Sequence, residues 1–230
     1  MSWRDFFEGD HSIYVNARHR LLHDELIAKA VARHIPGEHA RVLDYGCGEA
    51  SSAAHVAQRC AKLYLFDTSR LVRFKLEQRF ADAPGVVVLD EAGFEALAPA
   101  SLDMIVVVSV LQYVGEAEFE RWLENFHDKL APGGRLVLGD VVPKDLSPLE
   151  DARALLEFGW RGGFLGAALA GLVRTFFSSY RTLRNEFGLT TYDEKEMLGL
   201  LRDHRFAPER AAENIGHNQK RMTFVATRPA

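Results

Sequence analysis

Residues 104–108, MIVVV, form a run without a polar member, and this run restricts the fold of the chain most strongly. A strand with one face in water alternates apolar and polar residues, whereas a strand covered on both faces is apolar throughout. The run therefore predicts a central strand in a sheet that carries helices on both faces. With four other β-branched runs, the predicted strands lie at residues 41–45, 62–67, 85–90, 102–109 and 134–142.

Helical patterns separate these strands. Between residues 116 and 130, Phe119, Leu123 and Phe126 recur on one face, while charged residues occupy the other. Strands that alternate with helices are typical of βαβ units, so we expect an α/β fold with a doubly wound, mostly parallel sheet. Further helices are predicted at residues 17–35, 50–60, 69–81 and 192–204, and two last strands near 206–213 and 222–228.

The composition narrows the class of protein. Of the 230 residues 47% are hydrophobic, enough for a substantial core, and we expect a single domain. The formal net charge is -4, so the chain has no excess of positive charge to bind nucleic-acid phosphates, and we expect no nucleic-acid partner. Two cysteines and a polar, acidic first segment predict a cytoplasmic protein without a disulfide framework or a signal peptide. No apolar stretch approaches the roughly 20 residues that cross a bilayer.

The stretch VLDYGCGEA, residues 42–50, places two glycines one residue apart at the end of the first predicted strand. A strand, a glycine turn and a helix bring the free N–H groups of the helix N-terminus to a ligand. Two ligands commonly occupy such a turn, a dinucleotide and S-adenosylmethionine. The dinucleotide fingerprint is incomplete, because Ser51 stands where it has a glycine or alanine. Asp44 would also repel a pyrophosphate, whereas it would attract the amino group of the sulfonium compound.

From this turn onward, a series of motifs resembles the class I S-adenosylmethionine-dependent methyltransferases, over roughly residues 40–142. VLDYGCGEA is similar to the family's first motif, D-x-G-x-G-x-G, with Ala50 where a third glycine is usual. YLFDTS, VVVLDEAGFEAL, LDMIVVVSVLQYV and LAPGGRLVLGD resemble the segments at the second to fifth strands, in order. The resemblance implies a Rossmann-like sheet of seven strands with an antiparallel last strand, an N-terminal helical cap over residues 1–38, and S-adenosylmethionine as cofactor.

The resemblance also implies which residues hold the cofactor. Asp67 ends the second strand 19 residues after Gly48, close to the spacing at which an acid meets ribose hydroxyls. The acidic end of the third-strand segment is expected near the adenine. Each of these residues also has a purely structural interpretation, as a turn glycine, a helix cap or a strand-end acid. The predicted cofactor-binding residues are Asp44, Gly46, Gly48, Asp67, Thr68, Asp90, Glu91, Ser109, Gln112 and Arg18.

The segment after the fourth strand indicates the type of acceptor. Methyltransferases that modify exocyclic or amide nitrogens carry an Asp/Asn-Pro-Pro-Tyr/Phe pattern there, whereas this chain has SVLQYV, residues 109–114. That segment is similar to the one in small-molecule and quinone- or lipid-type methyltransferases, with Gln112 and Tyr113 near the cofactor or acceptor. We therefore expect methyl transfer to an oxygen or carbon of a small, apolar molecule. The alternatives are a non-catalytic S-adenosylmethionine-binding module, acting alone or as a subunit of a partner enzyme, and a nicotinamide oxidoreductase.

An N-terminal segment rich in histidine supplies the first catalytic candidates. The resemblance suggests that this segment folds over the methionine end of the cofactor, so that Tyr14, Arg18 or His19 binds its carboxylate or acts on the acceptor. His19 and His23 have the i, i+4 spacing of metal ligands. No nearby carboxylate or cysteine completes a site, so no metal is predicted, and solvated helix residues are the alternative.

The connection between the last two predicted strands supplies the other candidates. Residues 214–221, NIGHNQKR, would lie at the ligand-binding edge of the sheet, where His217 and Asn218 are candidates for acceptor contact or proton removal. The alternative is a solvated hairpin loop. The predicted catalytic residues are His19, His217 and Tyr14.

Residues 144–190 contain no strand candidate and are predicted to form a helical insertion after the fifth strand. Over residues 153–184, a largely apolar run carries five arginines against one acid, Glu157. We expect a lid over an apolar acceptor that also contacts an anionic membrane surface. A helical cap packed on the core and a dimer contact are the alternatives, and the oligomeric state is left open.

Overall fold

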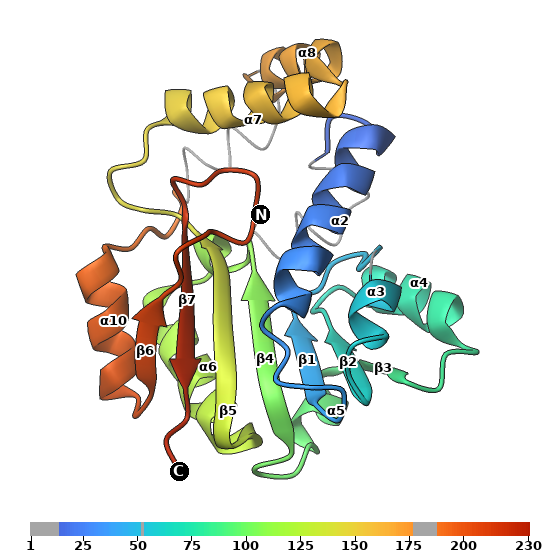
Figure 1. The fold of residues 1–230 in the computed structure, drawn as a ribbon, viewed down its shortest axis with the longest axis vertical. Coiled ribbons are helices and arrows are strands. Elements are labelled where there is room, and N and C mark those ends of the chain that lie inside the picture. The colour runs from blue at the N-terminus through green and yellow to red at the C-terminus, as the bar shows by residue number, and fades with distance from the viewer. Residues whose placement is uncertain (1–13, 52, 177–187) are drawn as a thin grey trace.

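A seven-stranded sheet organises the structure, a computed structural model that describes residues 14–51, 53–176 and 188–230 (Figure 1). The strands lie in the order β3-β2-β1-β4-β5-β7-β6. Strands β3, β2, β1, β4 and β5 are parallel to one another, and β7 is antiparallel to both β5 and β6. The predicted mostly parallel α/β sheet with an antiparallel last strand is thus confirmed. The strand bounds are β1 (Arg41–Tyr45), β2 (Lys62–Phe66), β3 (Val86–Leu89), β4 (Leu102–Val108), β5 (Leu130–Val141), β6 (Ala207–Arg210) and β7 (Met222–Thr227).

Strand β4 lies at the centre, between β1 and β5, as its apolar run predicts. Met104 and Val106 point into the core on one face of the sheet, and Ile105 and Val107 point into the core on the other. All four are at most 1% exposed. Residues 104–107 are therefore buried alternately on the two sides of the sheet, which is why none of these four is polar.

Helices cover both faces of the sheet (Figure 1). On one face lie α2 (Ala17–Ala32), α3 (Ala53–Ala57) and α4 (Arg70–Phe80), which bury Val31, Val56 and Leu76. On the other lie α5 (Glu91–Glu95), α6 (Glu116–Lys129) and α10 (Glu194–Asp203), which bury Phe94, Phe126 and Leu201. The doubly wound arrangement leaves the carboxyl edge of the parallel strands available for a site.

Several helix boundaries differ from the predicted ones for local reasons. Helix α3 begins at Ala53 and not near residue 50, because Ala50 has a φ of +43° and is outside the helical region. Strand β5 begins at Leu130, so the APGG segment belongs to the strand. The short helix α5 was not predicted; Asp90 caps it by accepting a hydrogen bond from the Gly93 N–H at 2.7 Å.

The insertion after β5 is helical in its described part. Helix α7 (Pro148–Gly162) begins with a capping box between Ser147 and Glu150 and ends at Gly163, whose φ is +72°. Helix α8 (Leu165–Phe176) follows, and together the α7–α8 pair lies beyond the carboxyl edge of the sheet (Figure 1). Residues 177–187 of the predicted insertion lie outside the described residues. No helix within the described residues is long and apolar enough to cross a membrane.

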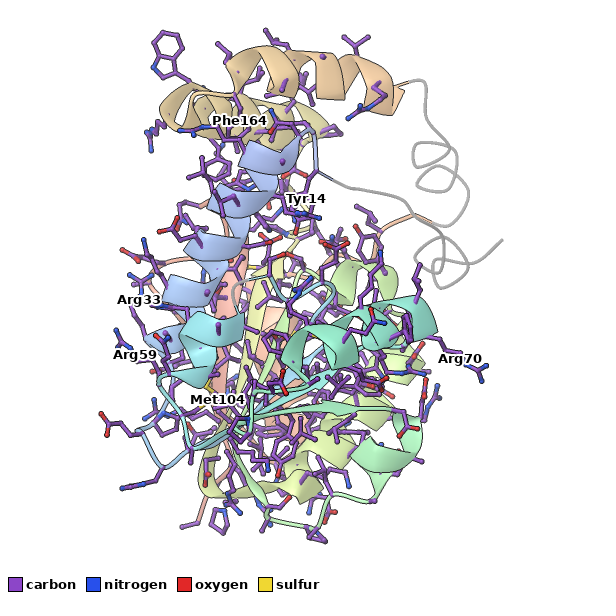
Figure 2. All side chains as sticks on the ribbon, turned by 90° about the vertical axis from the view of Figure 1, so that its right-hand side faces the viewer. Tyr14, Arg33, Arg59, Arg70, Met104 and Phe164 are labelled. Carbon is purple, nitrogen blue, oxygen red and sulfur yellow. The ribbon has the colours of Figure 1, made fainter. Side chains whose placement is uncertain are left out.

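The N-terminal half of α2 supports the α7–α8 pair (Figure 2). A Cβ atom on Gly171 of α8 would lie 2.2 Å from a methyl group of Val15, and one on Gly162 of α7 would lie 2.7 Å from a methyl group of Leu22. Arg18 donates a hydrogen bond to the carbonyl of Gly162. Because glycine allows this close approach, α2 connects the pair to the sheet.

Candidate active site

The glycine turn after β1 has the backbone that its sequence predicts. Gly46 and Gly48 have φ values of +78° and +55°, in the left-handed region that favours glycine. The N–H groups of Gly46 and Cys47 donate to the carbonyl of Phe66 at the end of β2, at 2.8 and 3.1 Å. A Cβ on Gly46 would lie 2.6 Å from a methyl group of Val110, whereas one on Gly48 would meet nothing within 4 Å. The turn is therefore closed on the side of β4 and open at Gly48.

Asp67, immediately after β2, supports this turn. Its Oδ2 accepts a hydrogen bond from the Gly48 N–H at 2.9 Å, and its Oδ1 accepts one from the Ser69 N–H at 2.9 Å. The carboxylate thus lies against the open side of the turn, 19 residues along the chain. A carboxylate has about four acceptor positions, so these bonds are compatible with additional hydroxyl donors.

Asp44 lies next to this carboxylate in an environment that disfavours its charge. Burial and the negative charge of Asp67 raise the pKa of Asp44 to about 7. Burial also raises the pKa of the Cys47 thiol well above its ordinary value, so Cys47 is not an activated nucleophile. Two carboxyl groups at one turn form a site that would bind a positively charged group favourably.

The other predicted cofactor residues of strands β2 and β3 have varied surroundings. Thr68 is exposed, and its carbonyl accepts a hydrogen bond from Arg73 at 3.0 Å. Arg73 also donates to the Asp67 carbonyl and to Glu91, at 2.6 and 3.2 Å, and so joins the ends of β2 and α5. Asp90 caps α5 through one carboxylate oxygen. Arg73 was not predicted as a member of the site, and its position follows from its place in the first turns of α4.

At the ends of β4 and β5 lies a charged network that the sequence did not reveal. Ser109, with a φ of +58°, donates from its hydroxyl to Asp140 at 2.7 Å. Arg221 donates to the same Asp140 oxygen at 2.7 Å and to the Gln112 side-chain oxygen at 3.3 Å. It also binds Asp151 of α7 through two hydrogen bonds, at 2.9 and 3.2 Å. The predicted residues Ser109 and Gln112 thus belong to a network centred on Arg221.

The three predicted catalytic residues lie together, from segments far apart in the sequence. The ring centroids of His19 and His217 are 6.3 Å apart, and that of Tyr14 is 5.4 Å from His19. His23 is 5.9 Å from both histidines. Two rings of the insertion complete this set, which we call the histidine cluster: Tyr14, His19, His23, Phe158, Phe164 and His217.

The insertion packs directly on two of these histidines. Phe164 stacks on His19 at a centroid distance of 5.0 Å, and Phe158 of α7 stacks on His217 at 5.1 Å. Figure 2 shows Phe164 on the side of the helical pair that faces α2, with Tyr14 below it. The cluster therefore lies between the α7–α8 pair, α2 and the segment between β6 and β7.

Burial keeps the histidines of this cluster neutral. Burial, with a smaller effect from the charge of His23, lowers the pKa values of His19 and His217 to about 4. Burial also lowers the pKa of His23, opposed by Asp140 and Asp24. His19 Nε2 and His23 Nδ1 are buried without a hydrogen-bond partner among the described residues. Buried polar atoms without partners are uncommon in native proteins and are found at ligand and catalytic sites.

Two predicted residues have contacts that change their expected roles. The Tyr14 hydroxyl donates to Asp24 at 3.1 Å, and burial together with the charge of Asp24 raises the pKa of Tyr14 far above neutrality. Arg18 reaches the carbonyl of Gly162 and so contacts the insertion. Arg20, one position beyond the predicted histidine, instead contacts Glu49 of the glycine turn, at 2.7 Å. Among the described residues, no group of three or more potential ligands is arranged to hold a metal ion.

The segment that contains the glycine turn is similar to a known protein family. Residues 43–136 match a family model described as a methyltransferase domain. This segment is similar to a methyltransferase domain. It runs from β1 into β5 and includes the turn and Asp67. The resemblance to the class I S-adenosylmethionine-dependent methyltransferases is confirmed by this match and by the fold. No curated protein matches the chain.

Solved structures share the fold of this chain at low identity. Magnesium protoporphyrin IX methyltransferase (ChlM) from Synechocystis PCC 6803, with bound SAH, is 20% identical, and the match covers 98% of this chain and 92% of that chain with a TM-score of 0.56. The CurJ carbon methyltransferase is 15% identical, with coverages of 94% and 56% and a TM-score of 0.57. The pyocyanin biosynthetic protein PhzM is 15% identical, with coverages of 99% and 62% and a TM-score of 0.60.

Proposed function

We propose that this protein is an S-adenosylmethionine-dependent methyltransferase that transfers a methyl group to an oxygen or carbon of a small, apolar molecule. The observation that carries this proposal is the arrangement at the carboxyl edge of the sheet. An open glycine turn with two carboxyl groups lies at the ends of β1 and β2. A cluster of buried, neutral histidines lies beside the charged network at the ends of β4 and β5.

The residues at the turn fit the proposed cofactor. The open space at Gly48 permits a ligand to approach the backbone, and Asp67, which lies against the turn, is the proposed acceptor for ribose hydroxyls. Asp44 would face a positively charged amino group, which would stabilise its ionised form. When bound, the cofactor supplies an electrophilic methyl group. Asp90, Glu91, Thr68, Ser109 and Gln112 remain proposed contacts around it.

His217 is the proposed proton acceptor for an acceptor molecule that carries a hydroxyl group, and His19 is proposed to orient that hydroxyl. Both rings are neutral at pH 7, because burial lowers each pKa to about 4. His19 Nδ1 accepts a hydrogen bond from the Val15 N–H at 3.3 Å, so the neutral ring carries its proton on the unpartnered Nε2, which can donate to the hydroxyl oxygen. Tyr14 remains protonated because its pKa is raised, so its proposed role is to position this cluster through its bond to Asp24.

The surroundings of the histidines support an apolar acceptor. Phe158 and Phe164 of the insertion cover His19 and His217, so a molecule that binds there meets aromatic surface on the side of the insertion. We propose that the α7–α8 pair is the lid of this site, which excludes water and holds the acceptor in line with the methyl donor. The proposed domain organisation is one methyltransferase domain with the lid within residues 144–190 and the N-terminal cap within residues 1–38, of which residues 177–187 and 1–13 lie outside the described residues.

The test is methyl transfer to an extract. Purified protein would be incubated with methyl-tritiated S-adenosylmethionine and an extract from its source, and the mixture partitioned between organic and aqueous phases. We expect labelled product in the organic phase, and none with the Asp67→Ala variant. Label confined to a polar amine would contradict the proposed acceptor class. Cofactor binding without any labelled product would favour the non-catalytic binding module.

A further inference from the structure

Exposed apolar side chains concentrate on the α7–α8 pair. Seven large hydrophobic residues are exposed among the described residues, and four of them lie on this pair. Leu149 is 82% exposed, Trp160 75%, Val173 62% and Leu169 50%. The pair approaches Val15 and Leu22 through Gly162 and Gly171. The four exposed side chains are not part of that contact. All four are open to solvent, and we call them together the apolar surface of the pair.

Helix α8 presents one face of this surface at the end of the molecule. Leu169, Ala170 and Val173 are exposed on one side, whereas Ala168 and Gly171 are buried on the other. Both views show α8 as the outermost element at one end (Figures 1 and 2). A flat or gently curved partner can therefore reach this face without a clash with the sheet.

The charges on the same surface favour an anionic partner. Glu150 and Asp151 are paired with Lys220 and Arg221, and Glu157 is paired with Arg153. Within the described part of the chain, the exposed Arg161 and Arg174 form no ion pair. Exposed Trp, Leu and Val side chains beside unpaired arginines have the chemistry of a membrane-interface element, in which the rings and aliphatic groups enter the headgroup region and the arginines meet lipid phosphates.

The size of the surface argues against a second copy of the chain as the occupant. Helices of 15 and 12 residues are about 22 and 18 Å long and about 10 Å wide, so the exposed faces of α7 and α8 together cover roughly 400 Å². A stable protein interface buries about 800 Å² on each partner. A bilayer has no such minimum, because a few inserted side chains and attracted charges already give reversible binding.

We propose that the surface of α7 and α8 formed by Leu149, Trp160, Arg161, Leu169, Val173 and Arg174 docks on an anionic lipid bilayer. The proposal rests on exposure and charge alone and does not depend on methyl transfer. Together with the proposed function, it would bring the proposed lid to the phase in which an apolar acceptor dissolves. Docking of this kind is peripheral and reversible.

The experiment is vesicle sedimentation with the full-length purified protein. Vesicles of phosphatidylcholine with 30% phosphatidylglycerol would be compared with vesicles of phosphatidylcholine alone. We expect at least tenfold tighter binding to the anionic vesicles. The Leu169→Glu/Val173→Glu variant should lose at least tenfold of this binding. The Arg161→Gln/Arg174→Gln variant should lose roughly fivefold for each arginine, because each adds attraction of about that size near an anionic surface.

The matched control is Leu71→Glu/Phe74→Glu, which places the same charges on exposed apolar positions of α4. It should bind the anionic vesicles as the unmodified protein does. Circular dichroism would establish that every variant is folded, and the two arginine changes test the proposal without adding acid to a helix. Equal binding to both vesicle types would overturn the proposal. So would a dimer in sedimentation equilibrium that Leu169→Glu/Val173→Glu dissociates, with no vesicle binding.

Discussion

Arg221 binds Asp151 through two hydrogen bonds, at 2.9 and 3.2 Å, and thereby joins the segment before β7 to helix α7. The same guanidinium contacts Asp140 at the end of β5 at 2.7 Å. Together with the packing of the pair on α2, this charge between two carboxylates holds the α7–α8 pair over the histidine cluster. This arrangement relates the helical insertion to the edge of the sheet at which the cofactor is proposed to bind.

Replacing Arg221 should destabilise the protein strongly. Arg221→Met leaves the buried Asp140 and the partly buried Asp151 without their counter-charge, and loss of one partner from a buried ion pair costs about 3–5 kcal/mol. Urea unfolding monitored by circular dichroism would measure the change in the free energy of unfolding. Arg33→Met, which breaks an exposed pair with Glu213, is the control and should have little effect. Equal effects of the two substitutions would contradict the central role of Arg221.

Ala50→Gly should stabilise the protein. Ala50 has a φ of +43°. In this region a Cβ lowers the stability of the folded state by about 1 kcal/mol, and glycine avoids this cost. The greater freedom of glycine in the unfolded chain offsets part of this gain, so we expect a net increase of about 0.5 kcal/mol. Ala54→Gly in helix α3 is the matched control and should lower stability by about 1 kcal/mol. Thermal unfolding would compare the two, and a loss of stability in both variants would refute the strain at Ala50.

The histidine cluster should make the protein sensitive to acid. The pKa values of His19 and His217 are about 4 in the folded state, below the ordinary 6.5, so the unfolded chain binds protons that the folded protein does not. Stability is fully present above pH 6.5 and is lost as the pH falls toward 4. Each histidine should account for about 1–2 kcal/mol of the loss between pH 7 and pH 5.

Thermal unfolding of His19→Gln and His217→Gln across this pH range would measure that contribution. Both variants should have a flatter pH dependence than the unmodified protein. His39→Gln changes an exposed histidine and should leave the dependence as it is. If the two cluster variants retained the full pH dependence, burial of the neutral rings would not be its cause.

Asp44→Asn should separate stability from cofactor binding. The pKa of Asp44 is raised to about 7, mainly by burial and then by the charge of Asp67, so its contribution to stability is lost as the pH rises through 7. At pH 8 the amide should increase the free energy of unfolding by on the order of 2 kcal/mol. The affinity for S-adenosylmethionine should rise with pH through 7 in the unmodified protein and be lower and flat in the variant. Calorimetric titration at several pH values would reveal either pattern.

The sheet and the glycine turn were predictable because their signals are local. A run such as MIVVV specifies a strand buried on both faces, and two glycines after a strand specify a turn. The network around Arg221 was not predictable in this way, since Arg221 is 81 residues from Asp140 and 70 from Asp151. Helix α5 escaped prediction because five residues carry too little periodicity.

The histidine cluster was predicted in part. The i, i+4 spacing of His19 and His23 places both rings on one face of α2, and the position of residues 214–221 at the sheet edge brings His217 to them. The aromatic partners Phe158 and Phe164 depend on how the insertion folds back onto α2. The insertion can pack on this part of the chain because Gly162 and Gly171 have no side chain. The sequence alone does not show that a Cβ at either position would clash with Leu22 or Val15.

Calorimetric titration of the purified protein with S-adenosylmethionine is the most direct test of the proposal that the glycine turn and Asp67 hold this cofactor. We predict binding at one site, weakened at least tenfold by Asp67→Ala and unchanged by Asp82→Ala, which removes an exposed carboxylate elsewhere. Binding of a nicotinamide dinucleotide in its place, or undiminished binding of S-adenosylmethionine by Asp67→Ala, would contradict the account.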